Sequence, residues 1–459
     1  MTIKSGLWSN EIFLWSVVVF VLLFATIHPI IKLCRLDGNL GNFFVFRDTA
    51  IALSHGQDLY AQSNDYVYPP LIAFLYQPFA SIPPHAAGAI SLIINALLFL
   101  ATIWLLAVEL SRRFLNRTNA LFVARVAAVA TLLTCDKIRG ELNSWETNVQ
   151  VLFMLTAALV LADRRPWLAG AALGFAFDIK YLPITLIPYL ILRRRWTMVG
   201  GFAASALLFS LLPAISMGWN GNLHALGEAY GGLAGLFKIP VHHAAHLYPM
   251  TDWRTLSVTS GIARFTGWPD QSALSVAAML GCVFASFAAL ASQRHNLSPL
   301  WWPPSLEQRD PRHRAMFAIE LIVVMMLTLV FSPFTNGAHL YLLLVANAAG
   351  AALLFSTPHR SSRWPLIIGM AVMYVGITLP PGGAYFRTIG DFSKWIGFPA
   401  WCVLVNCGTL FWTDLRIFCC EPAPVARTIA PTAALVEVRG GLEATQGMEA
   451  SLCRAVHVG

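Results

Sequence analysis

The sequence predicts an all-α polytopic membrane protein. Of its 459 residues, 57% are hydrophobic and only 12% are charged, whereas soluble domains carry about a quarter charged residues. A soluble fold of this length has too little interior to bury so much apolar side chain. Apolar runs of about 20 residues, the length that a helix needs to cross a bilayer, recur along the chain. Its 15 tryptophans fit a protein with two membrane interfaces.

About twelve apolar runs are predicted to span the bilayer. The first lacks a small-residue cleavage site, so it is expected to be a retained span rather than a signal peptide. The runs lie near 12–33, 86–108, 119–135, 148–163, 167–179, 181–192, 198–216, 272–292, 315–333, 339–356, 364–379 and 395–413. The fifth and sixth runs are short, which indicates tilted or incompletely spanning helices. Residues 71–81 are also apolar but too few to span, which suits a re-entrant or interfacial helix.

Arginine clusters in the short loops predict the orientation, because cytoplasmic loops are enriched in Lys and Arg. With a cytoplasmic N-terminus, all the clusters fall inside. They lie at 112–117, 164–165, 193–195, 309–314 and 360–363. The net charge of +8 is therefore interpreted as a topology signal, and no nucleic-acid partner is expected.

The predicted organisation is one transmembrane domain, 1–413, followed by a flexible cytoplasmic tail, 414–459. The tail is rich in Ala, Pro, Gly and Val and lacks helical periodicity. Two long outer loops, about 34–85 and 217–271, contain Trp, Tyr, Pro and apolar helical stretches, so they are expected to be folded. The outer side carries most of the acids and histidines, and we therefore expect the function to face away from the cytoplasm.

The first outer loop carries three candidate general bases. Apolar residues at helical spacing over 43–54 predict an amphipathic helix on the membrane surface, and a proline pair begins the next apolar helix. This arrangement places Asp48, Asp58 and Asp65 near one interface. They are either solvated loop acids and helix caps, or they include a base that activates a hydroxyl nucleophile where lipid meets water.

Polar side chains also stand at the outer ends of later spans. Asn148 and Gln150 lie at the mouth of a span, with Glu146 just outside. This polar cluster indicates a cavity wall, or it reflects helix capping by Ser144 or Thr147. Lys180 interrupts two apolar runs beside Asp178, as an interfacial ion pair or as a phosphate ligand. His339 follows a tight turn, as a plain interfacial residue or as a phosphate donor or proton shuttle.

Metal and redox chemistry are not expected from the sequence. His242 and His246 are spaced i, i+4, but no third zinc ligand is evident beside them. The eight cysteines show no C-x-x-C pairing. The prediction is therefore no metal and no cofactor.

Several motifs follow one another along most of the chain. They are G-Q-D-L-Y at 56–60, Y-V-Y-P-P-L at 66–71, E-T-N at 146–148, A-G-A-A-L-G-F-A-F-D-I-K-Y-L-P at 169–183, R-R-R-W at 193–196, L-S-V-T-S-G-I-A-R at 256–264 and the turn from Ser332 to His339. In this order they resemble the polyprenyl-phosphate-mannose-dependent α-mannosyltransferases of the GT-C superfamily of integral-membrane glycosyltransferases.

The resemblance implies a GT-C-like bundle with folded extracytoplasmic loops in a bacterial-type inner (cell) membrane. It implies transfer of a sugar, mannose or another hexose or pentose, from a polyprenyl-phosphate donor to a hydroxyl of a glycolipid or glycan at the outer face. The donor carries one phosphate, so no metal is required. Inversion at the anomeric carbon needs a carboxylate on the acceptor side and cationic or hydrogen-bonding groups on the leaving phosphate.

Roles for individual residues follow from this mechanism. Lys180, Arg254 and His339 lie on the outer side next to apolar helix ends, and they are expected to converge on the donor phosphate. The residues expected to line the cavity or contact the acceptor are Asn42, Tyr66, Tyr68, Glu146 and Asn148.

Two positions depart from the family pattern. An acid usually follows the first span in a D-F/L-x-V-Y-like motif, but Asn42 occupies that place here, and the Gln common in the polar motif is Glu146. Asparagine cannot act as a base. Asp58 or Asp65, with Asp48 close behind, is therefore expected to take the proton, and Glu141 or Glu146 comes next.

Two alternatives to an enzyme remain open. A transporter or flippase of a lipid-linked substrate would need ionisable groups near mid-span, and only Glu320 and Arg125 stand there. A catalytically inactive GT-C-like partner protein is consistent with Asn42. A glycosyl-transfer assay on membranes separates the enzyme from both.

Overall fold

The computed structural model describes residues 10–35, 40–60, 66–235, 250–252, 254–268, 270–294, 311–333, 335–357, 360–378 and 384–420. Contacts divide the chain into two units, Met1–Cys420 and Glu421–Gly459, and every described element lies in the first. Within the described ranges the regular elements are all helical, apart from one isolated antiparallel bridge between Thr255 and Asn336. The predicted all-α class is confirmed.

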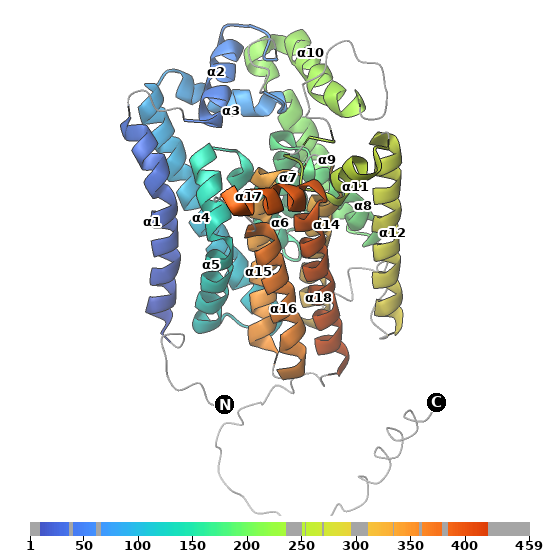
Figure 1. The fold of residues 1–459 in the computed structure, drawn as a ribbon. Helices are drawn as coiled ribbons and strands as arrows, with labels where there is room; N and C mark the ends of the chain where they lie inside the picture. Colours follow the sequence, from blue (N-terminus) through green and yellow to red (C-terminus); the bar gives the residue numbers. More distant parts are fainter. Residues whose placement is uncertain are drawn as a thin grey trace, which may run out of the picture. The chain divides into compact units, whose positions relative to one another are not determined.

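Every predicted apolar run is occupied by described helices, and further helices lie between the runs (Figure 1). They are α1 (Glu11–Cys34), α2 (Asn42–Ser54), α3 (Pro70–Ala80), α4 (Pro84–Leu115), α5 (Ala120–Ser144), α6 (Asn148–Leu161), α7 (Pro166–Ile179), η2 (Leu182–Leu186), α8 (Ile187–Leu192), α9 (Trp196–Leu211), α10 (Ala214–Gly235), α11 (Val258–Thr266), α12 (Asp270–Arg294), α14 (Pro311–Phe331), η3 (Gly337–Leu342), α15 (Leu343–Ser356), α16 (Arg360–Thr378), α17 (Ala384–Trp395) and α18 (Phe398–Cys420). Each predicted span overlaps one or two of them.

Helix length and apolarity confirm a multi-pass membrane protein. Four described helical stretches are long and apolar enough to cross a bilayer: Glu11–Cys34, Pro84–Leu115, His313–Phe331 and Gly337–Ser356. Two pairs bent by 101° and 63°, α9 with α10 and α17 with α18, bring the number up to six among the residues searched. Shorter apolar helices follow the remaining runs, and the total of about twelve spans stays a prediction.

Glycines allow α7 and α9 to pack with their backbones in contact. A methyl group built on Gly170 would lie 1.9 Å from the Met198 carbonyl oxygen, and one on Gly174 would lie 2.5 Å from the Phe202 carbonyl oxygen. These glycines are four residues apart, the spacing of the G-x-x-x-G motif that brings membrane helices close together. The motif fixes α7, and with it Lys180 at the end of α7, against the neighbouring helices.

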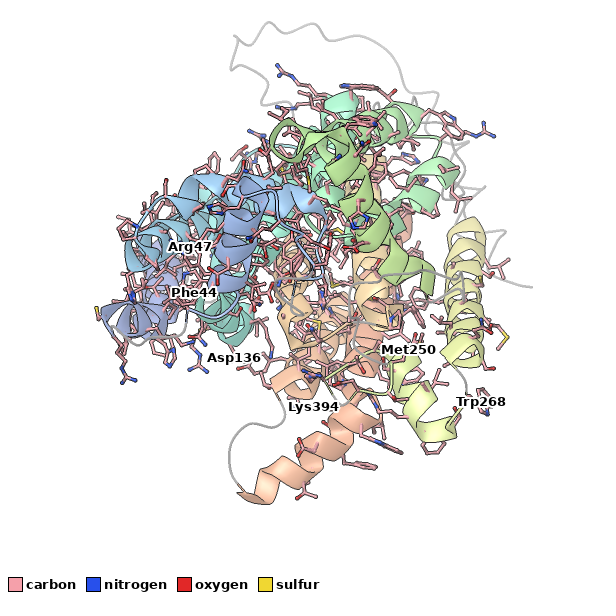
Figure 2. All side chains as sticks on the ribbon, turned by 90° about the horizontal axis from the view of Figure 1, so that it is seen from above. Phe44, Arg47, Asp136, Met250, Trp268 and Lys394 are labelled. Carbon is pink, nitrogen blue, oxygen red and sulfur yellow. The ribbon has the colours of Figure 1, made fainter. Side chains whose placement is uncertain are left out.

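α2 and α3 lie at one end of the helices α4 and α5 (Figure 1). Arg47 on α2 donates to the carbonyl oxygens of Phe79, Ala80 and Ile82 at 3.2–3.3 Å, which caps the C-terminal end of α3. Figure 2 looks onto this end and shows Arg47 on α2. The predicted surface helix over 43–54 and the short helix over 71–81 are both confirmed as helices.

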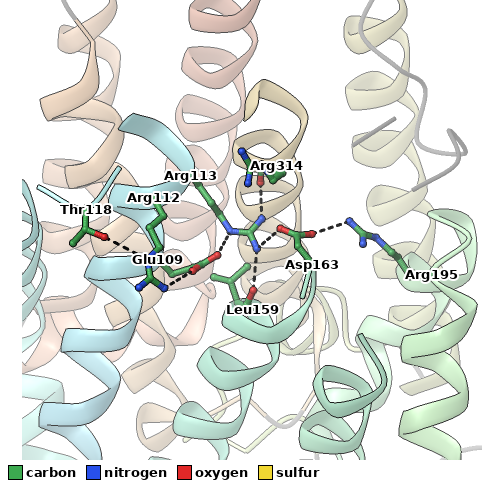
Figure 3. Close-up of polar contacts among 8 residues, drawn as sticks. All are labelled: Glu109, Arg112, Arg113, Thr118, Leu159, Asp163, Arg195 and Arg314. Carbon is green, nitrogen blue, oxygen red and sulfur yellow. Dashed lines mark hydrogen bonds and ion pairs between the residues drawn. The ribbon is translucent and has the colours of Figure 1, made fainter. Parts of the chain in front are cut away.

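An ion network joins four of the predicted cytoplasmic loops (Figure 3). Arg113 at the end of α4 pairs with Glu109 at 2.8 Å and with Asp163 at 2.9 Å. Its guanidinium also donates to the Arg314 carbonyl oxygen at 2.7 Å, and Arg195 pairs with Asp163 at 3.3 Å. The basic clusters after α4, after α6, after α8 and before α14 therefore meet at one end of the bundle, as the predicted alternation requires.

The C-terminal boundary differs from the sequence prediction. α18 continues to Cys420, so residues 414–420 are helical and do not belong to a tail beginning at 414. Asp414 is fully buried, so the chain is still packed against its neighbours at the residue where the tail was predicted to begin. Residues 421–459 lie outside the described residues.

Reporter fusions test the predicted orientation. A fusion after Arg117 is expected to report the cytoplasm and a fusion after Tyr60 the opposite side, because α4 separates the arginine network from the α2–α3 end. Alkaline phosphatase and green fluorescent protein activities in whole cells give the two readings. The same side for both positions contradicts the orientation.

Candidate active site

The first residues of α2 contact the end of α5. Gly41 has a φ of +60°, and a methyl group on it would lie 3.0 Å from the Ser144 carbonyl oxygen. Only glycine combines this left-handed conformation with so close an approach. As a result Asn42, the first residue of α2, reaches the turn after α5, where its side-chain amide donates a hydrogen bond to Glu146 Oε1.

Glu146 lies in a tight turn between α5 and α6. Trp145 ends α5 in the left-handed conformation with φ +52°. Its buried indole donates to the Gly88 carbonyl oxygen at 3.2 Å, which anchors the turn to α4. Tyr68 donates its hydroxyl to Glu146 Oε2 at 2.9 Å. The Glu146 residue is only 8% exposed, and the donors on its two oxygens compensate for the burial of a carboxylate.

A second set of contacts links another buried carboxylate to a lysine. Asn148, at the start of α6, donates to Glu141 Oε2 at 3.1 Å and accepts from Lys180 Nζ at 2.7 Å. The Lys180 ammonium also lies 5.5 Å from the centre of the Tyr68 ring, within the range of a cation–π contact. Tyr68 thus contacts both Glu146 and Lys180, and the two sets form one cluster.

Glu141 has a carboxylate oxygen with no partner. It lies in the last turn of α5, beyond the predicted span 119–135, and is 3% exposed. Its Oε1 has no hydrogen-bond partner among the described residues. Burial, and after it the negative charge of Glu146, raise the pKa of Glu141 to about 8, while donation from Asn148 and the charge of Lys180 act in the opposite direction. Oε1 is therefore the atom available to carry a proton.

A cavity of about 470 Å³ adjoins this carboxylate. Its wall comes from α1, the C-terminal half of α5 and the start of η3. The lining residues are His28, Asp136, Lys137, Arg139, Gly140, Glu141, Asn143, Ser144, Gly337 and Ala338. The wall includes four charged side chains and the amide of Asn143, so the cavity offers hydrogen-bond and charge partners to a polar ligand.

Two of the three predicted phosphate ligands lie together. The charge of Lys180 acts on the half-buried imidazole of His339, and Asn148 contacts both Lys180 and the Ala338 carbonyl oxygen. His339 Nδ1 accepts the backbone N–H of Asn336 at 3.1 Å. The neutral ring therefore carries its proton on Nε2, which is a donor.

The third predicted phosphate ligand has another partner. The bridge between Thr255 and Asn336 brings the segment around Arg254 beside the turn that carries His339. The Arg254 guanidinium donates to both carboxylate oxygens of Asp252, at 2.9 and 2.7 Å. The segment is thus adjacent to the cluster, and convergence of Arg254 on a phosphate stays a prediction.

Of the three predicted bases, the two that the structure describes, Asp48 and Asp58, are not part of the Glu146 cluster. Asp48 on α2 has a side chain that is 64% exposed and lies 3.8 Å from Arg47. Asp58 is exposed and accepts the backbone N–H of Tyr60 at 2.9 Å, which is the predicted turn-like setting. Asp65 lies outside the described residues. The role of each as a base stays a prediction.

Tyr66 is buried and supports the backbone at the start of α3. Its hydroxyl donates to the Pro69 carbonyl oxygen at 2.7 Å and accepts the Ala73 N–H at 3.3 Å. The two prolines and this tyrosine thus fix the angle at which α3 begins. Tyr68, two residues later in an extended segment, points to Glu146 instead.

The raised pKa of Glu141 predicts a pH dependence of stability. An unfolded glutamate has a pKa of about 4.3, so between about pH 4.3 and 8 the folded chain holds a proton that the unfolded chain releases. The free energy of unfolding therefore falls as pH rises through this window, by a few kcal/mol. The Glu141→Gln variant should lose this decline. Melting temperatures of the parent protein and of the variant, each measured at pH 5 and pH 8, test this prediction. An equal fall in melting temperature in the two proteins contradicts it.

The family model described as Glycosyltransferase family 87 matches residues 66–333, more than half of the chain. The chain belongs to glycosyltransferase family 87. The match includes Tyr68, Glu141, Glu146, Asn148 and Lys180. The region that matches the glycosyltransferase family therefore contains these members of the buried cluster around α5, α6 and α7.

Two curated relatives of this glycosyltransferase carry the same name, polyprenol-phosphate-mannose-dependent alpha-(1-2)-phosphatidylinositol mannoside mannosyltransferase. The one from Mycolicibacterium smegmatis is 30% identical over 167 residues, which cover 34% of this chain and 37% of the relative. The one from Mycobacterium tuberculosis is 27% identical over 154 residues, 31% of this chain and 36% of the relative. The matched stretch therefore spans little more than a third of each relative.

Proposed function

We propose that this family 87 member transfers a sugar, with mannose as the first candidate, from a polyprenyl-phosphate donor to a hydroxyl of a glycolipid or glycan. The reaction takes place at the outer face of a bacterial-type cell membrane. One observation carries the proposal: Asn42 and Tyr68 hold the buried carboxylate of Glu146, and Tyr68 also contacts the Lys180 ammonium. The names of the curated relatives support the lipid-linked donor and the sugar.

Glu146 is the proposed general base. The acceptor hydroxyl oxygen forms a bond to the anomeric carbon, and its proton passes to the Glu146 carboxylate. The two departures from the family pattern then have one explanation. Asn42 stands where the family has an acid and Glu146 where it has an amide, and these two side chains contact each other. The pair still consists of one carboxylate and one amide, with the two positions exchanged.

Lys180 and His339 are the proposed partners of the leaving group. As the bond between the anomeric carbon and the phosphate oxygen breaks, negative charge builds on polyprenyl phosphate. An ammonium group and a neutral imidazole N–H stabilise that charge. Attack and departure on opposite faces invert the configuration at the anomeric carbon. No step needs a metal ion.

The cavity beside Glu141 is the proposed place for the polar part of the acceptor. Its volume of about 470 Å³ falls within the usual range of small-ligand pockets, and its charged and amide side chains can bind sugar hydroxyls. The curated relatives act on phosphatidylinositol mannoside by name, so a glycolipid headgroup is the first acceptor to test.

The transporter alternative finds little support in the spans. Glu320 on α14 is buried and accepts hydrogen bonds from Tyr189 at 2.7 Å and Arg193 at 2.9 Å. Arg125 on α5 lies 5.9 Å from the centre of the Phe355 ring. The two ionisable groups that the sequence places within spans are thus both engaged in contacts between helices. Such contacts favour a structural role over a path for a substrate.

A transfer assay decides between the enzyme and its alternatives. Purified protein in proteoliposomes is given radiolabelled polyprenyl-phosphate mannose and a phosphatidylinositol mannoside acceptor, and lipid products are separated. We expect a labelled glycolipid that depends on both substrates. Absence of product across glycolipid and glycan acceptors, from protein with a normal melting temperature, supports the inactive-partner alternative.

A further inference from the structure

Two metal-binding side chains stand one helical turn apart on α10. His224 Nε2 lies 3.5 Å from Glu228 Oε1, at i, i+4 spacing. This spacing directs two side chains to the same face of a helix. His224 is 62% exposed at its side chain, whereas Glu228 is 9% exposed. One ligand is therefore accessible to solvent and the other is fixed within the protein.

A third oxygen donor comes from the connection after α2. The carboxylate of Asp58 lies with His224 and Glu228 so that one ligand atom from each is within 4.8 Å of the others. The Tyr60 N–H donates to Asp58 Oδ1 at 2.9 Å and fixes the carboxylate. Ligand atoms around a tetrahedral zinc lie about 3.4 Å apart, close to the 3.5 Å between His224 Nε2 and Glu228 Oε1.

Glu228 also has an unpaired oxygen in this place. Its Oε2 is buried and has no hydrogen-bond partner in the part of the chain that the structure describes. A buried carboxylate oxygen without a donor is costly. A cation held by the Glu228 carboxylate would lower this cost, so the unpaired atom favours a positively charged ligand at Glu228.

We propose that Asp58, His224 and Glu228 form a divalent-cation site. One imidazole nitrogen and two carboxylates suit Zn²⁺ or Mn²⁺ better than the all-oxygen preference of Mg²⁺ and Ca²⁺. Three protein ligands leave further coordination positions for water. The site plays no part in the glycosyl-transfer step proposed above, and the two proposals can be tested independently.

The metal would join α10 to the wall of the candidate active site. Tyr60, two residues after Asp58, donates its hydroxyl to the Tyr68 carbonyl oxygen at 2.8 Å. Tyr181, next to Lys180, donates to the Ala229 carbonyl oxygen at 3.0 Å, next to Glu228. A cation between the two segments therefore stiffens the backbones that position Tyr68 and Lys180.

Metal content and thermal stability test the site. The purified full chain is stripped with a chelator, given ZnCl₂ or MnCl₂ and desalted, and bound metal is counted by elemental mass spectrometry. We expect one more equivalent in the parent protein than in His224→Ala or Glu228→Gln, with metal affinity at least about tenfold lower in each variant. Metal should also raise the melting temperature of the parent protein.

The control is His55→Ala, which removes another exposed histidine and should keep the metal of the parent. His242, His243 and His246 are retained in every protein, so any metal that they hold cancels in the comparison. Equal metal content in the parent protein and both variants overturns the proposal. So does a melting temperature of the parent protein that metal leaves unchanged. Because neither readout depends on glycosyl transfer, failure here leaves the enzyme proposal unaffected.

Discussion

Glu146→Gln is expected to lower the rate of glycosyl transfer by about a hundredfold to ten-thousandfold, the usual effect of removing a general base. Glutamine keeps the size of the side chain and can still accept from Asn42 or Tyr68, but it cannot take a proton. The loss should therefore fall on the rate at saturating substrates, with donor binding largely preserved. Initial rates in proteoliposomes over a range of donor and acceptor concentrations give this separation.

The exchange of carboxylate and amide supplies a rescue test. In the double variant Asn42→Asp, Glu146→Gln, the carboxylate moves across the observed contact to position 42. We expect much of the lost rate to return. Asn42→Asp alone places two carboxylates in one buried contact, which is unfavourable, so it should lower both the melting temperature and the rate.

A matched control is Glu11→Gln, which makes the same change at an exposed carboxylate at the start of α1 and should leave the rate near that of the parent. If Glu146→Gln keeps normal turnover, Glu146 is not the base. A deficit at Asp48, Asp58 or Asp65 would then support the first outer loop as its source, and a deficit confined to Glu141→Gln would favour the carboxylate at the cavity. If Glu146→Gln loses activity and the double variant does not recover it, Glu146 remains the proposed base, but a carboxylate at position 42 cannot replace it.

Much of the fold could be predicted because its physical basis is local. An apolar run of sufficient length must form a helix in a bilayer, since every backbone N–H and C=O needs an internal partner. α4, α14 and α15 follow directly from this rule. The spacing of apolar residues over 43–54 predicted the helix α2, and Gly56 predicted the turn that contains Asp58. The end of α18 was missed because a buried Asp414 resembles a tail residue in sequence.

The candidate site could be predicted only in part, because its decisive contacts join distant segments. Asn42 and Glu146 each departed from the family pattern, and the sequence offered no distance between them. Their contact depends on the close approach of Gly41 to the end of α5, a tertiary feature. A paired departure of opposite sense, acid to amide and amide to acid, was the available signal. Lys180 and His339 were found from their places at helix ends, whereas the pairing of Arg254 with Asp252 was not foreseen.

Lys180→Ala is expected to reduce use of the lipid-linked donor by about tenfold to a hundredfold. A hydrogen bond to a charged group contributes about 1.5–3 kcal/mol, and a factor of ten corresponds to about 1.4 kcal/mol. The loss should appear in kcat/KM for the donor while the KM for the acceptor stays the same, because Lys180 is the proposed partner of the leaving phosphate. Lys180→Arg keeps the positive charge and should recover part of the activity.

The same substitution also leaves the Asn148 side-chain oxygen without its 2.7 Å partner, so a structural effect must be separated from a loss of phosphate binding. Melting temperatures of Lys180→Ala and Lys180→Arg make that separation, and Lys394→Ala on α17 controls for removal of a lysine elsewhere. A purely structural role would lower stability and impair donor and acceptor use together. An unchanged donor kcat/KM in a stable Lys180→Ala protein would assign the leaving phosphate to other residues, with His339 and Arg254 the next to replace.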